Sequence, residues 1–409
     1  MSSDTTSETS AGIVDEIDPD ETVELLRDMV RIPSPFFEEE EIAAYIYDWL
    51  DQRGLDPEYH AVSEPEITDF EGNNVVARLE GTDPDAPTVL LNGHMDTVQH
   101  VDGWTEDPCS GRIEDGKLYG QGACDMKGGL ASLLVAFENL SKRNLRGDVI
   151  LTTVVDEEGP FGLGTDATIR DGLTDDCDLA VVTEPAPTIT QQDIENPAIV
   201  LGARGRFLYE VTVTGTAAHG SQPDMGVNAA LDAARLATAF EGLELGQHPK
   251  LGSGSVCLLS IEGGGEPLSV PNRCVMEIDR HVVPGETAES VLADAEQLVA
   301  SLDLESDVDV SLRETPEPDM YFQPYVTDEN DPLVRPFFES IRTLFDTDPD
   351  VGYFSSIGDF NHLGGRAGIP TVIVGPSGAN VHGTGEYVQL DGVVETAQVV
   401  SDAVSRLVE

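Results

Sequence analysis

The 409-residue sequence predicts an α/β fold, in which a mostly parallel, doubly wound sheet carries an inserted ferredoxin-like α+β domain. Short apolar strands alternate with amphipathic helices, which predicts the sheet, and polar residues follow several strands directly. Between residues 205 and 315 the order changes to β-α-β-β-α-β, which predicts the insertion. We therefore expect residues 16–204 and 316–409 to form one domain, residues 205–315 a second, and residues 1–15 a disordered acidic tail.

Two helices open the first domain. Residues 20–31 form the first helix, which ends before Pro33 and Pro35. Residues 38–53 form the second, because its apolar residues share one helical face and Gly54 then closes it. These apolar residues are Ile42, Tyr45, Ile46, Trp49 and Leu50.

The strands of the first domain are short apolar runs. We expect them at residues 74–79, 88–92, 149–155, 179–182 and 371–374. A glycine-rich loop at residues 119–129 leads into a helix, and two more helices, at residues 337–345 and 393–407, follow the insertion. In the inserted domain, strands are expected at residues 207–213, 256–261 and 274–283, and helices at residues 228–240 and 291–302.

The composition is strongly acidic. The formal net charge is −55, and the lysines are Lys117, Lys127, Lys142 and Lys250. Because concentrated salt screens like charges, and because the acids are spread over every predicted element, we interpret the chain as a protein of a high-salt cytoplasm, as in salt-accumulating halophiles. An acidic interaction tail is the alternative, but it would concentrate the acids in one block. The negative charge also argues against nucleic-acid binding.

The cysteines and the apolar runs indicate the compartment. Five cysteines are scattered without a C-x-x-C pair, which is typical of reduced thiols in a cytosol. No apolar run approaches the roughly 18 residues of a membrane span, and residues 1–12 are polar without a basic segment. We therefore expect a cytoplasmic protein that is neither exported nor membrane-bound.

The polar residues that follow the strands form one set. They are His94, Asp96, Asp125, Glu157, Glu158, Glu184 and His382. In an open α/β sheet, functional residues gather beyond the carboxyl ends of the strands. Each residue alone could be a structural strand cap, but two histidines with several carboxylates suit zinc, cobalt or manganese. One ion uses three or four ligands, whereas five ligands with a central carboxylate suit two ions about 3.5–4 Å apart.

Six segments carry a resemblance to a known family. They are residues 93–98 (Gly-His-Met-Asp-Thr-Val), 125–129, 156–159, 183–185, 218–220 and His382. Together they resemble the acetylornithine deacetylase/succinyl-diaminopimelate desuccinylase family of co-catalytic zinc metallopeptidases, which also includes glutamate carboxypeptidases, in a halophilic version. The resemblance covers residues 20–409. It implies a zinc-peptidase catalytic domain with an inserted lid and dimerisation domain.

The resemblance also implies which residues hold two divalent ions. Asp125 would bridge both ions, and the peptide bond after it would be cis. His94 and Glu184 would complete one ligand set, and Glu158 and His382 would complete the other. The ions would be Zn²⁺, with Co²⁺ or Mn²⁺ as alternatives.

Three further residues receive catalytic roles from the resemblance. Asp96 would accept the second ring N–H of His94 and fix its orientation. Glu157 would be the general base for a metal-bound water, the nucleophile. His219, on the inserted domain, would stabilise the oxyanion. In the family this histidine comes from the partner subunit, which implies a homodimer through the lid domain.

The residues that would bind the substrate depart from the family pattern. The family commonly has Asn where this chain has Leu268, and Arg where it has His281. Arg280 cannot simply replace that Arg, because neighbouring residues of a strand point to opposite faces. The candidates for binding a substrate carboxylate are Arg204, Arg273, Arg280 and His281.

The function implied by the resemblance is a dinuclear metal-dependent hydrolase of amino-acid metabolism. It would cleave the amide bond of N-acyl amino acids, as a desuccinylase or an acetylornithine deacetylase does. A metallo-carboxypeptidase or dipeptidase would use the same site, so only the substrate pocket decides between these activities. A catalytically silent metal-binding protein is the third alternative, and the intact ligand set with Glu157 argues against it.

Overall fold

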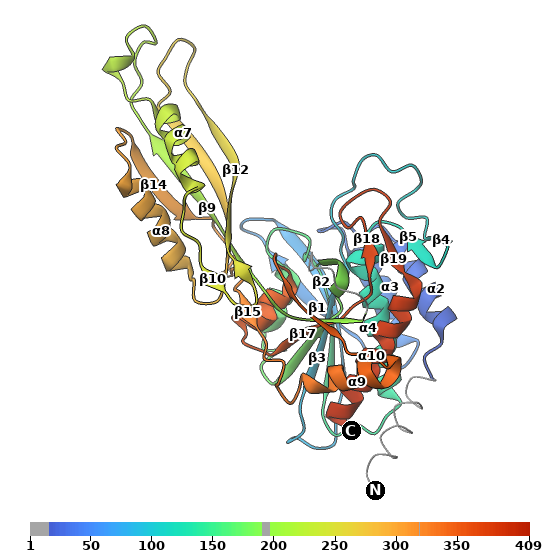
Figure 1. The fold of residues 1–409 in the computed structure, drawn as a ribbon. Coiled ribbons are helices and arrows are strands. Elements are labelled where there is room, and N and C mark those ends of the chain that lie inside the picture. Colours follow the sequence, from blue (N-terminus) through green and yellow to red (C-terminus); the bar gives the residue numbers. More distant parts are fainter. Residues whose placement is uncertain (1–15, 190–196, 319) are drawn as a thin grey trace. The chain divides into compact units, whose positions relative to one another are not determined.

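The computed structural model describes residues 16–189, 197–318 and 320–409, which form two compact units (Figure 1). Unit 1 contains the chain up to Ala203 and from Val326 onwards, and unit 2 runs from Arg204 to Tyr325. The chain re-enters unit 1 later than the expected residue 316, because Phe322 still pairs with Arg206 at the start of unit 2. The expected tail, residues 1–15, lies outside the described residues.

Unit 1 is built on one mixed sheet with the strand order β1-β2-β6-β3-β7-β17-β8-β15, in which β16 also pairs with β8. The strands are β1 (Glu58–Glu64), β2 (Phe70–Leu79), β3 (Val89–His94), β6 (Val149–Val154), β7 (Leu179–Val182), β8 (Ala198–Ala203), β15 (Tyr325–Val326), β16 (Asp350–Phe354) and β17 (Thr371–Ile373). The central strands β6, β3, β7 and β17 are parallel, and β2 and β8 flank them antiparallel. The predicted α/β sheet is confirmed, with antiparallel strands added on both sides of its parallel centre.

Two neighbouring residues of β3 show that helices cover both faces of this sheet. A side chain added at Gly93 would contact Met126 and also Leu130 of α4 (Gly128–Ser141). The amide of Asn92 instead donates to Thr165 of α5 (Leu163–Arg170). Because successive residues of a strand point to opposite faces, α4 and α5 lie on opposite sides of the sheet. This is the doubly wound arrangement.

The helical layer around α4 joins distant parts of the sequence (Figure 1). α10 (Leu390–Val408) packs against α4, α9 (Arg335–Phe345) and α2 (Pro19–Val30). α3 (Glu40–Asp51) is tied to this layer by Arg53, which pairs with Glu21 of α2 and Glu138 of α4. The first helix begins at Pro19 because the Asp18 side chain caps it. On the other side, α5 packs against the short helical segment η3 (Asn361–Arg366). The four-residue helix α6 (Ala186–Ile189) follows β7.

A second, smaller sheet in unit 1 was not predicted. Its order is β18-β19-β5-β4, with β18 (Gly378–Ala379), β19 (Tyr387–Gln389), β5 (Lys117–Tyr119) and β4 (Arg112–Glu114). β19 contacts the helical turn η1 (Ala123–Lys127). This sheet therefore brings the loop that follows β5 next to the loop between β18 and β19.

Unit 2 is the expected ferredoxin-like unit. Its elements are β9 (Gly205–Thr214), α7 (Ala229–Phe240), β12 (Ser255–Gly264), β13 (Arg273–Val282), α8 (Ala288–Ser301) and β14 (Asp307–Leu312), with a short hairpin of β10 (Gln247–His248) and β11 (Gly252–Ser253) and the turn η2 (Pro223–Met225). The antiparallel order β12-β13-β9-β14 gives one buried face and one open face, because burial alternates along β9 and β13. Asn228 caps α7 with its side chain.

A membrane-spanning helix would need a long apolar stretch. Over the part of the chain that the structure describes, no helix has both the length and the apolar character needed to cross a bilayer.

Candidate metal centre

The polar residues predicted from the strand ends meet at one edge of the unit 1 sheet. His94 ends β3, Glu157 and Glu158 follow β6, and Glu184 follows β7. These three strands are neighbours and run parallel, so their carboxyl ends lie side by side. Asp125 reaches the same place from η1, and His382 reaches it from the loop between β18 and β19.

One group of donor atoms surrounds His94, which is 1 % exposed. Its Nε2 lies 3.3 Å from Oδ1 of Asp125 and 3.4 Å from Oε1 of Glu184. The peptide bond between Asp125 and Met126 is cis, as the resemblance implied. Imidazole and carboxylate donors at these separations suit a divalent ion such as Zn²⁺.

A second group surrounds His382, which is half exposed. Its Nε2 lies 2.8 Å from Oε1 of Glu158 and 3.3 Å from Oδ2 of Asp125. The two oxygens of Asp125 therefore face two different histidines. The donor set fits a pair of cations with Asp125 between them, and ligand atoms of His94, Asp125 and Glu158 also lie within 4.8 Å of one another.

The electrostatics of the chain alone favour positive charge in this cluster. Hydrogen bonds to Asp125 and Glu158 raise the pKa of His382 to about 11. Burial would raise the pKa of Asp125, but the contacts with His382 and His94 lower it below its usual range. Burial and the charge of Asp125 raise the pKa of Glu184 to about 8 and that of Glu158 to about 7. The carboxylates thus hold protons on the two histidines, in the positions where cations would bind.

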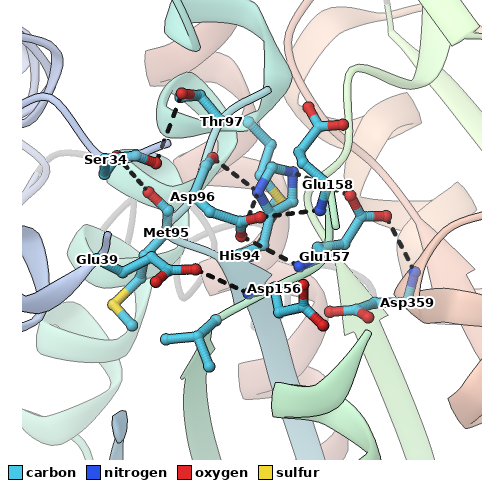
Figure 2. A network of polar contacts seen from close by, with 12 residues as sticks. Ser34, Glu39, His94, Met95, Asp96, Thr97, Asp156, Glu157, Glu158 and Asp359 are labelled. Carbon is cyan, nitrogen blue, oxygen red and sulfur yellow. Dashed lines mark hydrogen bonds and ion pairs between the residues drawn. The ribbon is translucent and has the colours of Figure 1, made fainter. Parts of the chain in front are cut away.

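Asp96 contacts the segments that carry two candidate ligands, His94 and Glu158 (Figure 2). The ring Nδ1 of His94 is 3.0 Å from the backbone oxygen of Asp96 and 3.4 Å from its Oδ1. The Asp96 carboxylate also accepts the backbone N–H groups of Glu157, at 3.2 Å, and Glu158, at 2.8 Å. The ring N–H of His94 was expected to donate to the Asp96 carboxylate. The nearer acceptor is instead the backbone carbonyl of Asp96. The carboxylate itself holds the turn after β6.

Glu157 differs from the acids that contact a histidine directly. Its Oε2 is 3.8 Å from Nε2 of His94, and its Oε1 accepts the backbone N–H of Asp359 at 3.2 Å. Distance alone does not exclude Glu157 as a metal ligand, since one of its oxygens lies within 4.8 Å of ligand atoms of His94 and Glu184. Burial, with the negative charges of Glu184 and Glu158, raises the pKa of Glu157 well above its usual range, although His94 opposes this. A carboxylate with a raised pKa is suited to act as a general base near neutral pH.

Three buried acids that support the site were missed from the sequence. Glu39, just before α3, accepts the backbone N–H of Asp156 at 3.1 Å, and Asp156 has the left-handed φ of 60° that turns the chain into the site. Asp359 orients Glu157 through its N–H and is itself held by the Thr165 hydroxyl. Glu386 binds the loop of Asp125. No local pattern marks these acids, because the contacts that tie them to the site are made with residues far away in the sequence.

The candidate substrate residues and His219 belong to unit 2. His219 is exposed, and its Nδ1 lies 2.8 Å from Oγ of Ser221. Arg273 is exposed, and His281 lies 3.5 Å from Asp279. Arg280 is fully buried, and its Nη2 donates to Glu286 at 2.6 Å. Because this charge is already compensated inside unit 2, Arg280 is the weakest of the substrate candidates.

The third arginine candidate, Arg204, lies at the boundary of unit 2. Its guanidinium donates to the backbone oxygen of Leu251, and burial lowers its pKa.

Comparisons with known proteins show what this chain is similar to. Residues 90–406 match the model of the Peptidase family M20/M25/M40. A succinyl-diaminopimelate desuccinylase of Methylorubrum extorquens is 33 % identical over 226 residues, which are 53 % of this chain and 56 % of that protein. The match thus spans little more than half the length of this curated relative.

Solved structures share the fold along nearly the whole chain. An aminopeptidase from Bacillus cereus has a TM-score of 0.76 at 20 % identity, covering 96 % of this chain and 99 % of that one. An M20 family metallo-carboxypeptidase from Sulfolobus solfataricus has a TM-score of 0.75 at 17 % identity, covering 94 % and 98 %. At these identities the likeness concerns the fold, and it supports the predicted catalytic domain with an insertion.

Proposed function

This chain belongs to the Peptidase family M20/M25/M40, and from this premise we propose that it is a dinuclear metal-dependent hydrolase of N-acyl amino acids. The proposed type is a succinyl-diaminopimelate desuccinylase or acetylornithine deacetylase, in line with the name of the relative from Methylorubrum extorquens. The observation that carries the proposal is the position of Asp125, whose two oxygens face His94 and His382 separately. A carboxylate shared in this way is what a pair of cations requires.

The proposed roles follow from the contacts of each side chain. His94 and Glu184 would hold one ion and Glu158 and His382 the other, with Asp125 between them. Two ions held at these positions, Zn²⁺ or as alternatives Co²⁺ or Mn²⁺, would activate a water molecule and polarise the scissile carbonyl.

Glu157 would move the proton. Its Oε1 is held by the N–H of Asp359, so Oε2, on the side of His94, is free to accept a proton from the attacking water. The same oxygen would then deliver this proton to the leaving nitrogen. Asp96 would keep both His94 and the Glu157–Glu158 turn in place during the transfer.

We also propose that His219 stabilises the oxyanion from the partner subunit of a homodimer. The surface of unit 2 supports an interface, because β12 is an edge strand and carries the exposed apolar residues Leu259 and Ile261. Leu231 of α7, which contacts β12, is exposed as well. Light scattering would test this proposal: Ile261→Asp should yield monomers with reduced activity, and a fully active monomer would contradict the role of His219.

A carboxypeptidase or dipeptidase activity is the second candidate. It is favoured by the full-length similarity to an aminopeptidase and a carboxypeptidase, and by the departures at Leu268 and His281. The substrate carboxylate would then be bound by Arg273, His281 or Arg204, which are the remaining candidates.

A substrate panel tests the proposed function. Metal-free protein would be reloaded with Zn²⁺, Co²⁺ or Mn²⁺ and assayed with N-succinyl-diaminopimelate, N-acetylornithine and a set of dipeptides, at low and molar KCl. We expect hydrolysis of an N-acyl amino acid that a chelator abolishes. Hydrolysis of dipeptides alone would favour the second candidate, and no hydrolysis of any substrate would refute both.

The working environment is also a proposal. With a net charge of −55, the chain repels itself strongly in dilute buffer, and salt near molar concentration reduces the screening length to about 3 Å. We therefore propose a cytoplasm of high ionic strength. The five cysteines are all free, which is compatible with a reducing compartment.

A further inference from the structure

Glu386 makes four backbone contacts with the loop that carries Asp125. Its Oε1 accepts the N–H groups of Cys124, at 2.8 Å, and Asp125, at 3.1 Å. Its Oε2 accepts the N–H of Gly122 at 2.9 Å, and its backbone oxygen accepts the N–H of Gly120 at 3.0 Å. The side chain is 2 % exposed, so these bonds form away from solvent.

Glu386 accepts the backbone N–H groups that a regular helix would satisfy within the loop itself. Gly122 has a left-handed φ of 74°, and Asp125 and Met126 have non-helical dihedral angles, so no regular helix organises this segment. A buried backbone N–H without an acceptor costs roughly 1–3 kcal/mol, and a carboxylate is a stronger acceptor than a neutral group. The conformation of the loop therefore depends on Glu386.

The same residue belongs to the segment that carries His382. Glu386 lies four positions after His382, and Tyr387 pairs with Tyr119 in the small sheet, next to the Gly120–Glu386 contact. Oδ2 of Asp125 and Nε2 of His382 are 3.3 Å apart. Glu386 thus connects two loops: its side chain binds the loop of Asp125, and its backbone belongs to the segment of His382.

We propose that Glu386 is a positioning residue that sets the spacing between Asp125 and His382 and thereby controls binding of the second cation. Glu386 would not itself be a ligand, because both of its oxygens already accept N–H groups. This inference rests on the proposed two-ion site. It predicts that a change at Glu386 weakens the ion on the His382 side more than the ion on the His94 side.

Glu386→Gln tests this inference, because it keeps the size of the side chain but turns one acceptor into a donor that faces an N–H group. Glu64→Gln is the matched control. Glu64 is 6 % exposed, and its carboxylate also accepts three backbone N–H groups, from Glu66, Ile67 and Thr68, in a turn that carries no candidate ligand.

The measurement is a Co²⁺ titration of metal-free protein, followed by calorimetry and by visible absorption. The wild type and Glu64→Gln should bind two ions alike. In Glu386→Gln the second ion should bind about ten- to a hundred-fold more weakly, with a changed absorption spectrum, while the first ion stays within about threefold of wild type. Thermal unfolding would check that both variants lose similar stability.

Each remaining outcome has a fixed meaning. If Glu386→Gln binds both ions with wild-type affinity, Glu386 is only structural and the inference is wrong. If the wild type itself does not bind two ions, the proposed function fails first, and that result is visible without any variant. Should Glu386→Gln not fold, Glu386→Asp, which keeps the charge but shortens the side chain, must show the same selective weakening, and unchanged binding there would overturn the inference.

Discussion

The two units treat buried charge in opposite ways. At the edge of the unit 1 sheet, His94, Asp96, Asp156 and Glu184 are all buried, and the central strands that carry them are buried along their whole length. In the described sheet of unit 2, the buried face is apolar apart from Arg280. Its acids, such as Glu210 and Glu277, lie on the open face.

This difference separates function from stability. A buried charge costs several kcal/mol unless a partner compensates it, so a cluster of buried acids is stable only where cations or protons balance it. Unit 1 gathers several such charges at its candidate metal centre, whereas the buried charges of unit 2, Arg280 and Asp232, are each compensated by neighbouring groups. Substitutions at the edge of unit 1 should therefore change activity and metal binding, and substitutions at the buried Arg280–Glu286 pair of unit 2 should change stability.

The largest expected effect lies at the edge of unit 1. Glu157→Gln keeps the shape of the side chain but removes the base, so kcat should fall by about 10²- to 10⁴-fold. Metal stoichiometry should stay at the wild-type value, because Glu157 is not among the proposed ligands. Steady-state kinetics together with metal analysis measure both quantities, and activity within a few-fold of wild type would show that Glu157 is not the base.

The corresponding test in unit 2 concerns stability. Arg280→Met leaves the mostly buried Glu286, whose side chain is 14 % exposed, without its ion-pair partner and should lower the free energy of unfolding by about 3–5 kcal/mol in urea titrations. Arg206→Met is the matched control, since its pair with Asp279 is partly exposed and should contribute less than about 1 kcal/mol. If Arg280→Met also weakened Co²⁺ binding to unit 1, the separation of the two units would be wrong.

A pH effect sharpens the comparison within unit 1. Burial and the nearby Arg366 lower the pKa of His362 to about 4, from about 6.5 in the unfolded chain. Between these values the unfolded state binds a proton that the folded state does not, so stability is present above pH 6.5 and is lost as the pH falls toward 4. The loss should be on the order of 3 kcal/mol. His362→Asn should remove this part of the pH dependence of unfolding. If the wild type and His362→Asn lost stability identically as the pH falls, His362 would not be the cause of the loss.

The smallest expected effect is on the open face of unit 2. Glu277 of β13 lies directly opposite Glu210 of β9, and like charges in this arrangement destabilise a sheet. Glu277→Lys should raise the free energy of unfolding by about 0.5 kcal/mol in dilute buffer. The gain should vanish in molar KCl, because salt screens exposed charges. A gain that is the same at both salt concentrations would point to packing rather than charge.

The sequence predicted the parts of the fold that depend on local pattern. The runs 88–92 and 149–155 became the buried strands β3 and β6, and the residues after them meet at one edge because parallel strands end together. β1 was missed because its exposed, polar residues between Glu58 and Glu64 lack a clear apolar alternation. β8 is a fully buried, apolar run of six residues. It has the pattern of a buried strand, but it was not predicted.

The candidate ligands were identified because each follows a strand or belongs to a family motif. Glu39, Asp359 and Glu386 were not, since the hydrogen bonds that tie them to the site are made with residues at least 100 positions away in the sequence. Among 77 acidic residues, nothing local distinguishes them from acids on the surface. Arg280 was predicted as a substrate residue, but its guanidinium is already paired with Glu286, six residues further along the chain.

The contacts of Asp96 have a consequence for how this site tolerates mutation. One side chain touches His94 and also accepts the backbone N–H groups of Glu157 and Glu158, so two ligands and the proposed base share a single support. Residues with a shared partner do not contribute independently to stability or activity. Asp96→Asn combined with a change at position 157 or 158 should therefore lose less than the two single losses added together. Evolution at this edge would have to proceed by coupled replacements, while the open loops of unit 2 can vary one residue at a time.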